Sequence, residues 1–147
     1  MMMSILTPVL ALVAWTLVVW FWMVVTRIPA MRKARLGPDE GKHTKVLAGK
    51  LPSQVQAVAD NYNHLLEQPT IFYALAFYVH LSATDSPLNI GLAWAYVALR
   101  VVHSLVQNTS NVVTVRFYLF LASTACLIAI VAGQGMRLFA AALTFSS

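Results

Sequence analysis

Ionisable and amide side chains recur at helical spacing inside otherwise apolar stretches of this chain. They form three groups: Asp60, Asn63, His64 and Glu67; Arg100, His103 and Gln107; and Arg116 alone. At about 100° per residue, each group falls on one face of a helix. A charge at the centre of a membrane helix costs roughly 2.5–3.5 kcal/mol, so groups of this kind are functional candidates by default.

The chemistry that these residue types suggest is the binding of an anion. Glu67 is expected within ion-pair reach of Arg100 or Arg116, in its own or a neighbouring subunit, because an unpaired buried carboxylate would take up a proton instead. One such pair could simply fix helix packing. A surplus of positive charge over three helices favours an anionic ligand. His64, Glu67 and His103 match no recognised zinc spacing, so no metal is expected.

The composition indicates a single-domain integral membrane protein over residues 1–147. Hydrophobic residues make up 59% of the chain and charged residues 10%, against about 25% charged in soluble domains. This excludes a soluble globular enzyme, a disordered chain and a nucleic-acid-binding domain. The single cysteine, Cys126, excludes an intramolecular disulfide, and its apolar neighbours indicate a packing role.

Four helices, at about 5–28, 53–82, 87–107 and 112–135, are predicted to position the polar groups as an antiparallel transmembrane bundle. A proline at residue 29 is expected to end the first helix. Ser53 is expected to cap the second in a capping box with Gln56, and Ser86 to cap the third. Two glycines near residue 135 are expected to end the fourth, and residues 137–147 could continue it.

The distribution of basic residues predicts the orientation in the membrane. Seven of the ten lie between the first two apolar runs: Arg27, Arg32, Lys33, Arg35, Lys42, Lys45 and Lys50. Lysine and arginine beside membrane spans stay cytoplasmic, and they can also hold anionic lipid headgroups. Both termini are then periplasmic, and the three polar groups share the inner half of the membrane. His80, near the outer end, is interpreted as an interfacial residue rather than a ligand.

The chain resembles a known family. Residues 63–69, Asn-His-Leu-Leu-Glu-Gln-Pro, followed by Ile-Phe-Tyr-Ala-Leu at 71–75, are similar to the second helix of the membrane-associated proteins in eicosanoid and glutathione metabolism, the MAPEG family. The segment Arg-Val-Val-His-Ser at 100–104, with Asn111 and Arg116 after it, resembles that family's third and fourth helices. The resemblance covers essentially the whole chain and is strongest to the bacterial branch, which implies the bacterial inner membrane.

The resemblance implies a homotrimer that binds glutathione between subunits near the cytoplasmic side. Arg116 matches the arginine that stabilises the glutathione thiolate, so it is the candidate catalytic residue. Glu67 matches a glutathione contact, and Arg100 and His103 match an arginine and a histidine of the prostaglandin E synthase type. With Asn63, His64 and Gln107, these make the predicted ligand-binding set. A lipophilic electrophile from the bilayer would be the second substrate.

The sequence also departs from the family's glutathione pattern. Asp60 stands seven residues before Glu67, where the family has an arginine, and His64 stands three before it, where the family has an asparagine. A carboxylate at position 60 would repel a glutathione carboxylate. Two functions therefore stay open: a glutathione-dependent transferase or peroxidase, or a non-catalytic protein of the same fold that binds a lipid or another anion. A proton-coupled exporter using Glu67 is disfavoured by the long basic loop and the arginine-bearing helices.

Overall fold

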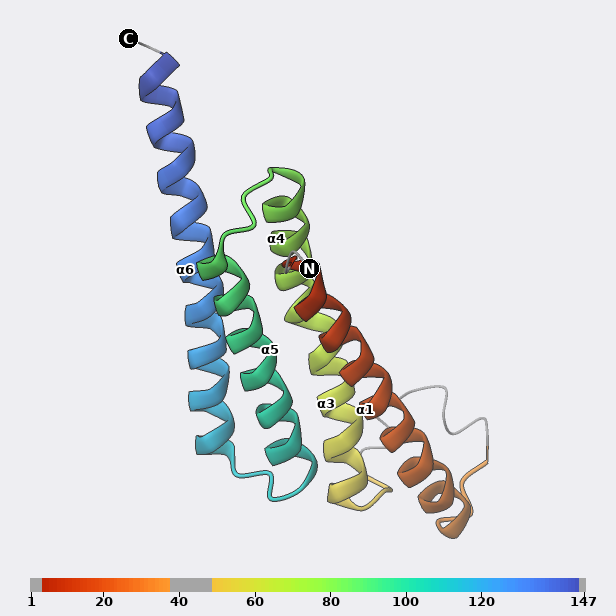
Figure 1. Ribbon diagram of the computed structural model, residues 1–147. Helices are drawn as coiled ribbons and strands as arrows, with labels where there is room; N and C mark the ends of the chain where they lie inside the picture. The colour runs from red at the N-terminus through yellow and green to blue at the C-terminus, as the bar shows by residue number, and fades with distance from the viewer. Residues whose placement is uncertain (1–3, 38–48, 146–147) are drawn as a thin grey trace.

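The computed structural model describes residues 4–37 and 49–145, and its ordered elements there are all helices. They are α1 (Leu6–Lys33), α3 (Ser53–Glu67), α4 (Pro69–Leu81), α5 (Pro87–Asn108) and α6 (Val113–Phe145), arranged as a bundle (Figure 1). Three of them, α1, α5 and α6, are long and apolar enough to cross a membrane. The prediction of an all-α membrane protein is confirmed. Most of the predicted basic loop, including Lys42 and Lys45, lies outside the described residues.

The first helix is longer than predicted. It runs through Pro29 and continues to Lys33, although a proline inside a helix removes one backbone hydrogen bond. Its end is a Schellman motif at Arg35, which adopts a left-handed φ of 54°. The Leu36 N–H donates to the Met31 carbonyl at 3.1 Å, which satisfies a carbonyl that the helix end leaves free. The local stop signal is therefore this turn and not the proline.

The predicted second helix is divided into α3 and α4 at Gln68. Pro69 has no N–H to donate to the carbonyl four residues earlier, so the ladder is interrupted there. Gln68 keeps helical dihedral angles, which lets α4 continue in roughly the direction of α3 (Figure 1). Ser53 is not the cap that was expected: Pro52 holds the capping position, and no side chain caps this helix. Because each half is short, a fourth membrane span remains a prediction that depends on the two halves acting together.

The third predicted helix begins as expected, whereas the fourth ends later. The Ser86 hydroxyl accepts a hydrogen bond from the Asn89 N–H at 3.2 Å, as an N-cap should. The last helix continues past Gly133 and Gly135 to Phe145. A glycine costs a helix only about 1 kcal/mol relative to alanine, so two of them do not stop an apolar segment. At 33 residues, α6 is roughly 50 Å long, well over the hydrocarbon thickness of about 30 Å.

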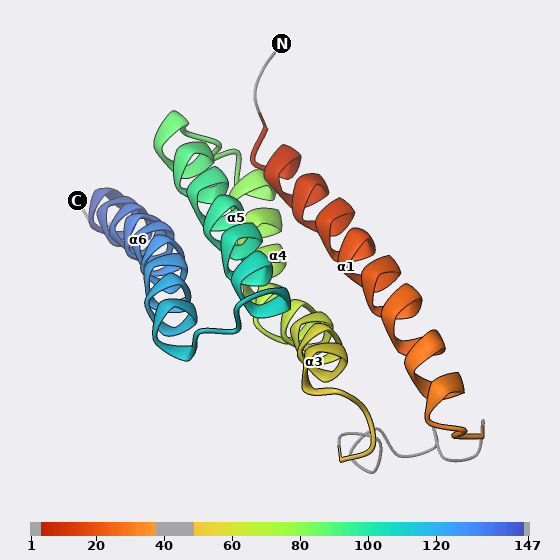
Figure 2. The same ribbon diagram turned by 90° about the horizontal axis from the view of Figure 1, so that it is seen from below.

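The helix α5 occupies the centre of the bundle. It packs most extensively against its antiparallel neighbour α6, and α1 and α3 cover its other side (Figure 2). The buried apolar core is drawn from all five helices and includes Leu12, Val19, Leu65, Phe72, Val79, Tyr96, Leu127 and Ile130. Large apolar side chains also face outward on α1 and α6, such as Leu17 and Ile128. Outward apolar faces of this kind suit contact with lipid.

Candidate functional site

Arg100 is the centre of a polar cluster, the arginine site, formed by His64, Arg100, His103, Arg116 and Phe120. The Arg100 side chain is 0% exposed. Its Nη1 lies 3.2 Å from Nε2 of His64 on α3. A guanidinium has donors only, so this imidazole nitrogen must accept. The guanidinium carbon lies 5.9 Å from the centre of the Phe120 ring, within cation–π range.

His103 stands one helical turn beyond Arg100 and completes a pair of imidazoles. Its ring centre is 5.1 Å from that of His64. Its Nε2 lies 3.3 Å from the Gln107 amide oxygen, and an amide oxygen can only accept, so Nε2 is the donor. Its buried Nδ1 has no partner among the described residues. In the neutral ring that atom is a hydrogen-bond acceptor, so it can accept a hydrogen bond from a bound molecule.

Arg116, on the first turn of α6, provides the second cation. It is half-buried, and its Nη1 donates to the Asn111 amide oxygen at 2.6 Å. Buried nitrogens of both arginines, Nε and Nη2 of Arg100 and Nε of Arg116, have no acceptor in the described part of the chain. The only ion pair described is between His80 and Asp85, so within residues 4–37 and 49–145 no carboxylate neutralises either arginine. Among the described residues, the positive charge of the site is therefore uncompensated.

A cavity of about 270 Å³ opens beside these groups. It is lined by His64, His103, Val113, Arg116, Phe117 and Phe120. Imidazole and guanidinium groups form its polar wall, and an aliphatic and two aromatic side chains form the apolar one. Its volume is slightly below the roughly 300–1,000 Å³ of typical small-molecule pockets. The arrangement suits an anionic group held beside an apolar one.

The structure brings the predicted basic residues together but leaves the carboxylates apart from them. His64, Arg100, His103 and Gln107 come together as expected, whereas Glu67 and Asn63 are exposed on the outside of α3. Asp60 is exposed too and accepts a hydrogen bond from the Gln56 amide at 2.8 Å. Within one chain, Glu67 makes no described contact with Arg100 or Arg116. A contact with a neighbouring subunit stays a prediction.

The geometry of α3 explains this division. His64 lies at the edge of the buried face, and at about 100° per residue positions 60, 63 and 67 all fall to one side of it. The other side carries Ala57, Asn61 and Leu65, which are buried. The four polar residues do share one arc, as predicted, but only its edge faces α5. The apolar spacing of the buried positions was the signal that fixes which side faces inward.

Two further hydrogen bonds involve side chains that the sequence pattern did not identify as part of the cluster. The Ser104 hydroxyl donates to the Asn61 amide oxygen at 3.1 Å and links α5 to α3. The Tyr96 hydroxyl donates to the Gln68 side chain at the break between α3 and α4, and the Tyr96 ring stacks on Phe72 at 4.6 Å. Asn61 lies four residues before the buried Leu65, so the helical period of the apolar residues could have identified Asn61 as an inward-facing position. Nothing in the sequence pairs Gln68 with Tyr96.

Metal-ligating side chains and the cysteine thiol are the remaining groups that the sequence analysis considered. Across the described ranges, no three histidine, cysteine or acidic side chains lie close enough to hold a metal ion. Cys126 is half-buried on α6, and its thiol donates to the Ala122 carbonyl at 3.5 Å. This contact within one helix agrees with the packing role that the sequence indicates.

Comparison with protein families gives the class of the chain. The model of the MAPEG family matches residues 5–135, which covers all the helices apart from the last turns of α6. The chain therefore belongs to the MAPEG family and is a membrane protein of that family. No curated protein and no solved structure matched it.

Proposed function

We propose that this MAPEG protein is a glutathione-dependent transferase or peroxidase that acts on lipophilic electrophiles. The observation that carries the proposal is a partly apolar cavity with Arg116 on its wall and the buried Arg100 behind His64, neither arginine having a described carboxylate partner. A buried charge without a partner is costly, so an anionic ligand would relieve the cost. Glutathione offers two carboxylates and, after ionisation, a thiolate.

The donor set fits a glutathione thiol. When bound, glutathione supplies the nucleophilic sulfur. Arg116 at the cavity wall would stabilise negative charge on that sulfur, because an adjacent cation lowers a thiol pKa. Nδ1 of His103 would accept a hydrogen bond from the thiol, and the thiol proton would leave to water as the thiolate forms. Phe117 and Phe120 would hold the apolar electrophile that enters from the bilayer.

The outward face of α3 supports a site completed by a neighbouring subunit. Asp60, Asn63 and Glu67 are exposed there, and contact with lipid would be unfavourable for all three. A homotrimer would cover them. Arg100 is fully enclosed in its own chain, so the half-buried Arg116 is the arginine that Glu67 of a neighbour would reach.

The assay for this proposal is conjugation of glutathione to a lipophilic chromogenic electrophile, with purified protein in mild detergent. Arg116→Ala should lower the rate by about 10²-fold or more, the usual size of a lost electrostatic contact in a transition state. Arg137→Ala, which removes an exposed arginine near the far end of α6, should leave the rate unchanged. Absence of any glutathione-dependent rate in the wild-type protein would contradict the proposal.

The alternative, a non-catalytic protein that binds a lipid or another anion, is favoured by one observation. Asp60 and Glu67 share the outward face of α3, so a tripeptide bound between subunits there would meet two carboxylates. Thermal melts separate the alternatives. Stabilisation of the wild-type protein by a fatty-acid anion but not by glutathione would favour the binder.

A further inference from the structure

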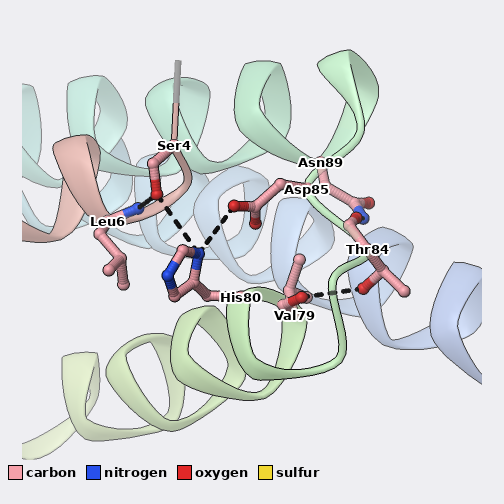
Figure 3. Close-up of polar contacts among 7 residues, drawn as sticks. All are labelled: Ser4, Leu6, Val79, His80, Thr84, Asp85 and Asn89. Atoms are coloured by element: carbon pink, nitrogen blue, oxygen red, sulfur yellow. Dashed lines mark hydrogen bonds and ion pairs between the residues drawn. The ribbon is translucent and has the colours of Figure 1, made fainter. Parts of the chain in front are cut away.

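A second and larger cavity lies at the opposite end of the bundle from the arginine site. Its volume is about 680 Å³, and it is lined by Ser4, His80, Asp85, Pro87, Ile90, Gly91 and Trp94. Three parts of the chain form it: the segment before α1, the end of α4 with the following loop, and the first two turns of α5 (Figure 3). The volume is within the range of pockets that enclose a ligand.

Its polar end is an imidazole–carboxylate pair. His80 Nδ1 lies 2.8 Å from Asp85 Oδ2 and 3.5 Å from the Ser4 hydroxyl, as Figure 3 shows. In a catalytic triad the serine and the carboxylate contact different ring nitrogens. Here both contact Nδ1, so these three side chains cannot relay a proton from the hydroxyl, and a hydrolytic role is excluded.

The second carboxylate oxygen of Asp85 lacks a hydrogen-bond donor. Asp85 Oδ1 is buried and has no hydrogen-bond partner among the described residues. A carboxylate oxygen only accepts, and a buried acceptor without a donor costs about 1–3 kcal/mol. With a neutral imidazole the pair carries a net charge of −1, and with a protonated one it carries none. The polar end therefore favours a ligand group that donates hydrogen bonds, and with a neutral imidazole it favours a cationic one.

The remainder of the cavity is apolar and follows α5 along its axis. Ile90, Gly91 and Trp94 line it, and from Pro87 to Trp94 the helix rises about 10 Å. Apart from the two chain neighbours and the backbone of α5 itself, no atom lies within 4 Å of the position that a Cβ on Gly91 would take, so the space beside this glycine is open. Trp94 is partly exposed, and a tryptophan near the end of a span is typical of the headgroup level.

We propose that this cavity, the His80–Asp85 cavity, binds a phospholipid whose headgroup carries a primary ammonium, with an acyl chain along Ile90, Gly91 and Trp94. An ammonium has three N–H donors and would bind the Asp85 carboxylate, whose side chain is 24% exposed and lines the cavity. A choline headgroup has the same charge but no N–H donor. The proposal does not depend on the function of the arginine site, which has the opposite charge and lies at the other end of the bundle.

The test compares ethanolamine and choline phospholipids with matched acyl chains, added to delipidated protein and counted by native mass spectrometry. The wild-type protein should hold the ethanolamine lipid roughly tenfold or more tightly than the choline lipid, because a charge-assisted hydrogen bond is worth at least about 1.5 kcal/mol. Asp85→Asn should bring the ratio close to one. His80→Gln should retain the preference, because it leaves the carboxylate in place. Free ethanolamine should not compete at equal concentration.

A variant that fills the cavity keeps the test decisive if Asp85→Asn fails to fold. Gly91→Leu should displace both lipids from the cavity, while the melting temperature without lipid stays the same or rises, because leucine is the better helix former. Gly135→Leu, at another open glycine on α6, is the matched control and should retain the lipid preference. An equal affinity for the two lipids in the wild-type protein would overturn the proposal. The proposal would also be overturned if Gly91→Leu dissociated the assembly while lipid retention stayed unchanged. A second copy of the chain would then occupy the His80–Asp85 cavity.

Discussion

A guanidinium keeps its positive charge at any physiological pH, so a protein that buries one must supply acceptors for its five N–H groups. Arg100 is fully buried, yet within the described ranges His64 is the one hydrogen-bond partner that it has, and Nε and Nη2 have none. Packing alone does not require this, because an apolar side chain of similar volume would often be as stable or more stable. The buried charge of Arg100 therefore favours an anionic ligand nearby over a purely structural role for this residue.

Replacement of Arg100 by methionine tests this interpretation. Arg100→Met keeps most of the volume and removes the uncompensated charge, so without ligand the melting temperature should stay within a few degrees of wild type or rise. Stabilisation by glutathione should disappear. The measurement is a pair of melts with and without glutathione. A large loss of stability without ligand, together with unchanged stabilisation by glutathione, would show that Arg100 is structural.

Glu67 gives a second prediction at this scale. If it pairs with Arg116 of a neighbouring subunit, Glu67→Ala should weaken the assembly by about 3–5 kcal/mol, the usual cost of leaving a buried charge without its partner. A double-mutant cycle with Arg116→Ala, read from subunit dissociation, measures the coupling. A coupling near zero would mean that Glu67 faces lipid or water in the assembly. Asp60→Ala on the same face is the control.

Among the helices, the break between α3 and α4 has the largest effect on the geometry of the arginine site. Gln68 sits at the break and accepts the Tyr96 hydroxyl from α5, and Tyr96 lies one turn from Arg100. The position of His64 beside Arg100 therefore depends on how α3 and α4 join. Pro69 sets that join because it lacks an N–H.

Pro69→Ala would restore the missing donor and let α3 and α4 form one continuous helix. Amide hydrogen exchange over residues 65–70 should slow, because the backbone gains a hydrogen bond and loses its local defect. Glutathione-dependent activity should fall, since the His64 ring would rotate relative to α5. Ile71→Ala, two residues later, keeps the proline, removes only an exposed apolar side chain and should change neither readout. Faster exchange in the proline variant would contradict this account.

Local sequence rules predicted some elements and missed others for identifiable physical reasons. The Ser86 cap was correct because Ser86 directly precedes the proline that begins α5, whereas Ser53 failed as a cap because Pro52 takes the capping position of α3. Pro29 and the glycines at 133 and 135 did not end their helices, because a proline costs a helix only about 3 kcal/mol and a glycine about 1 kcal/mol, and helix-forming residues follow each of them. The basic half of the arginine site was predictable from the 3.6-residue period. The outward position of Glu67 was not, because it depends on which side of His64 packs on α5.

At the scale of the whole molecule, the orientation in the membrane is the testable property. The seven basic residues between the first two apolar runs predict that this loop is cytoplasmic. In a Cys126→Ala background, Lys42→Cys should resist an impermeant thiol reagent added to intact cells, and Ser82→Cys, exposed at the opposite end, should react. Labelling of Lys42→Cys but not of Ser82→Cys would show that the protein has the opposite orientation, with the arginine site on the outer side of the membrane.

The central claim is that the arginine site ionises a bound thiol. The most direct measurement is the ultraviolet absorbance of the glutathione thiolate when glutathione is added to the purified protein at neutral pH. The account predicts a thiolate signal that saturates with the wild-type protein, persists in Arg137→Ala and is lost in Arg116→Ala. A wild-type protein that gives no thiolate signal, or an Arg116→Ala variant that gives the full signal, would contradict it.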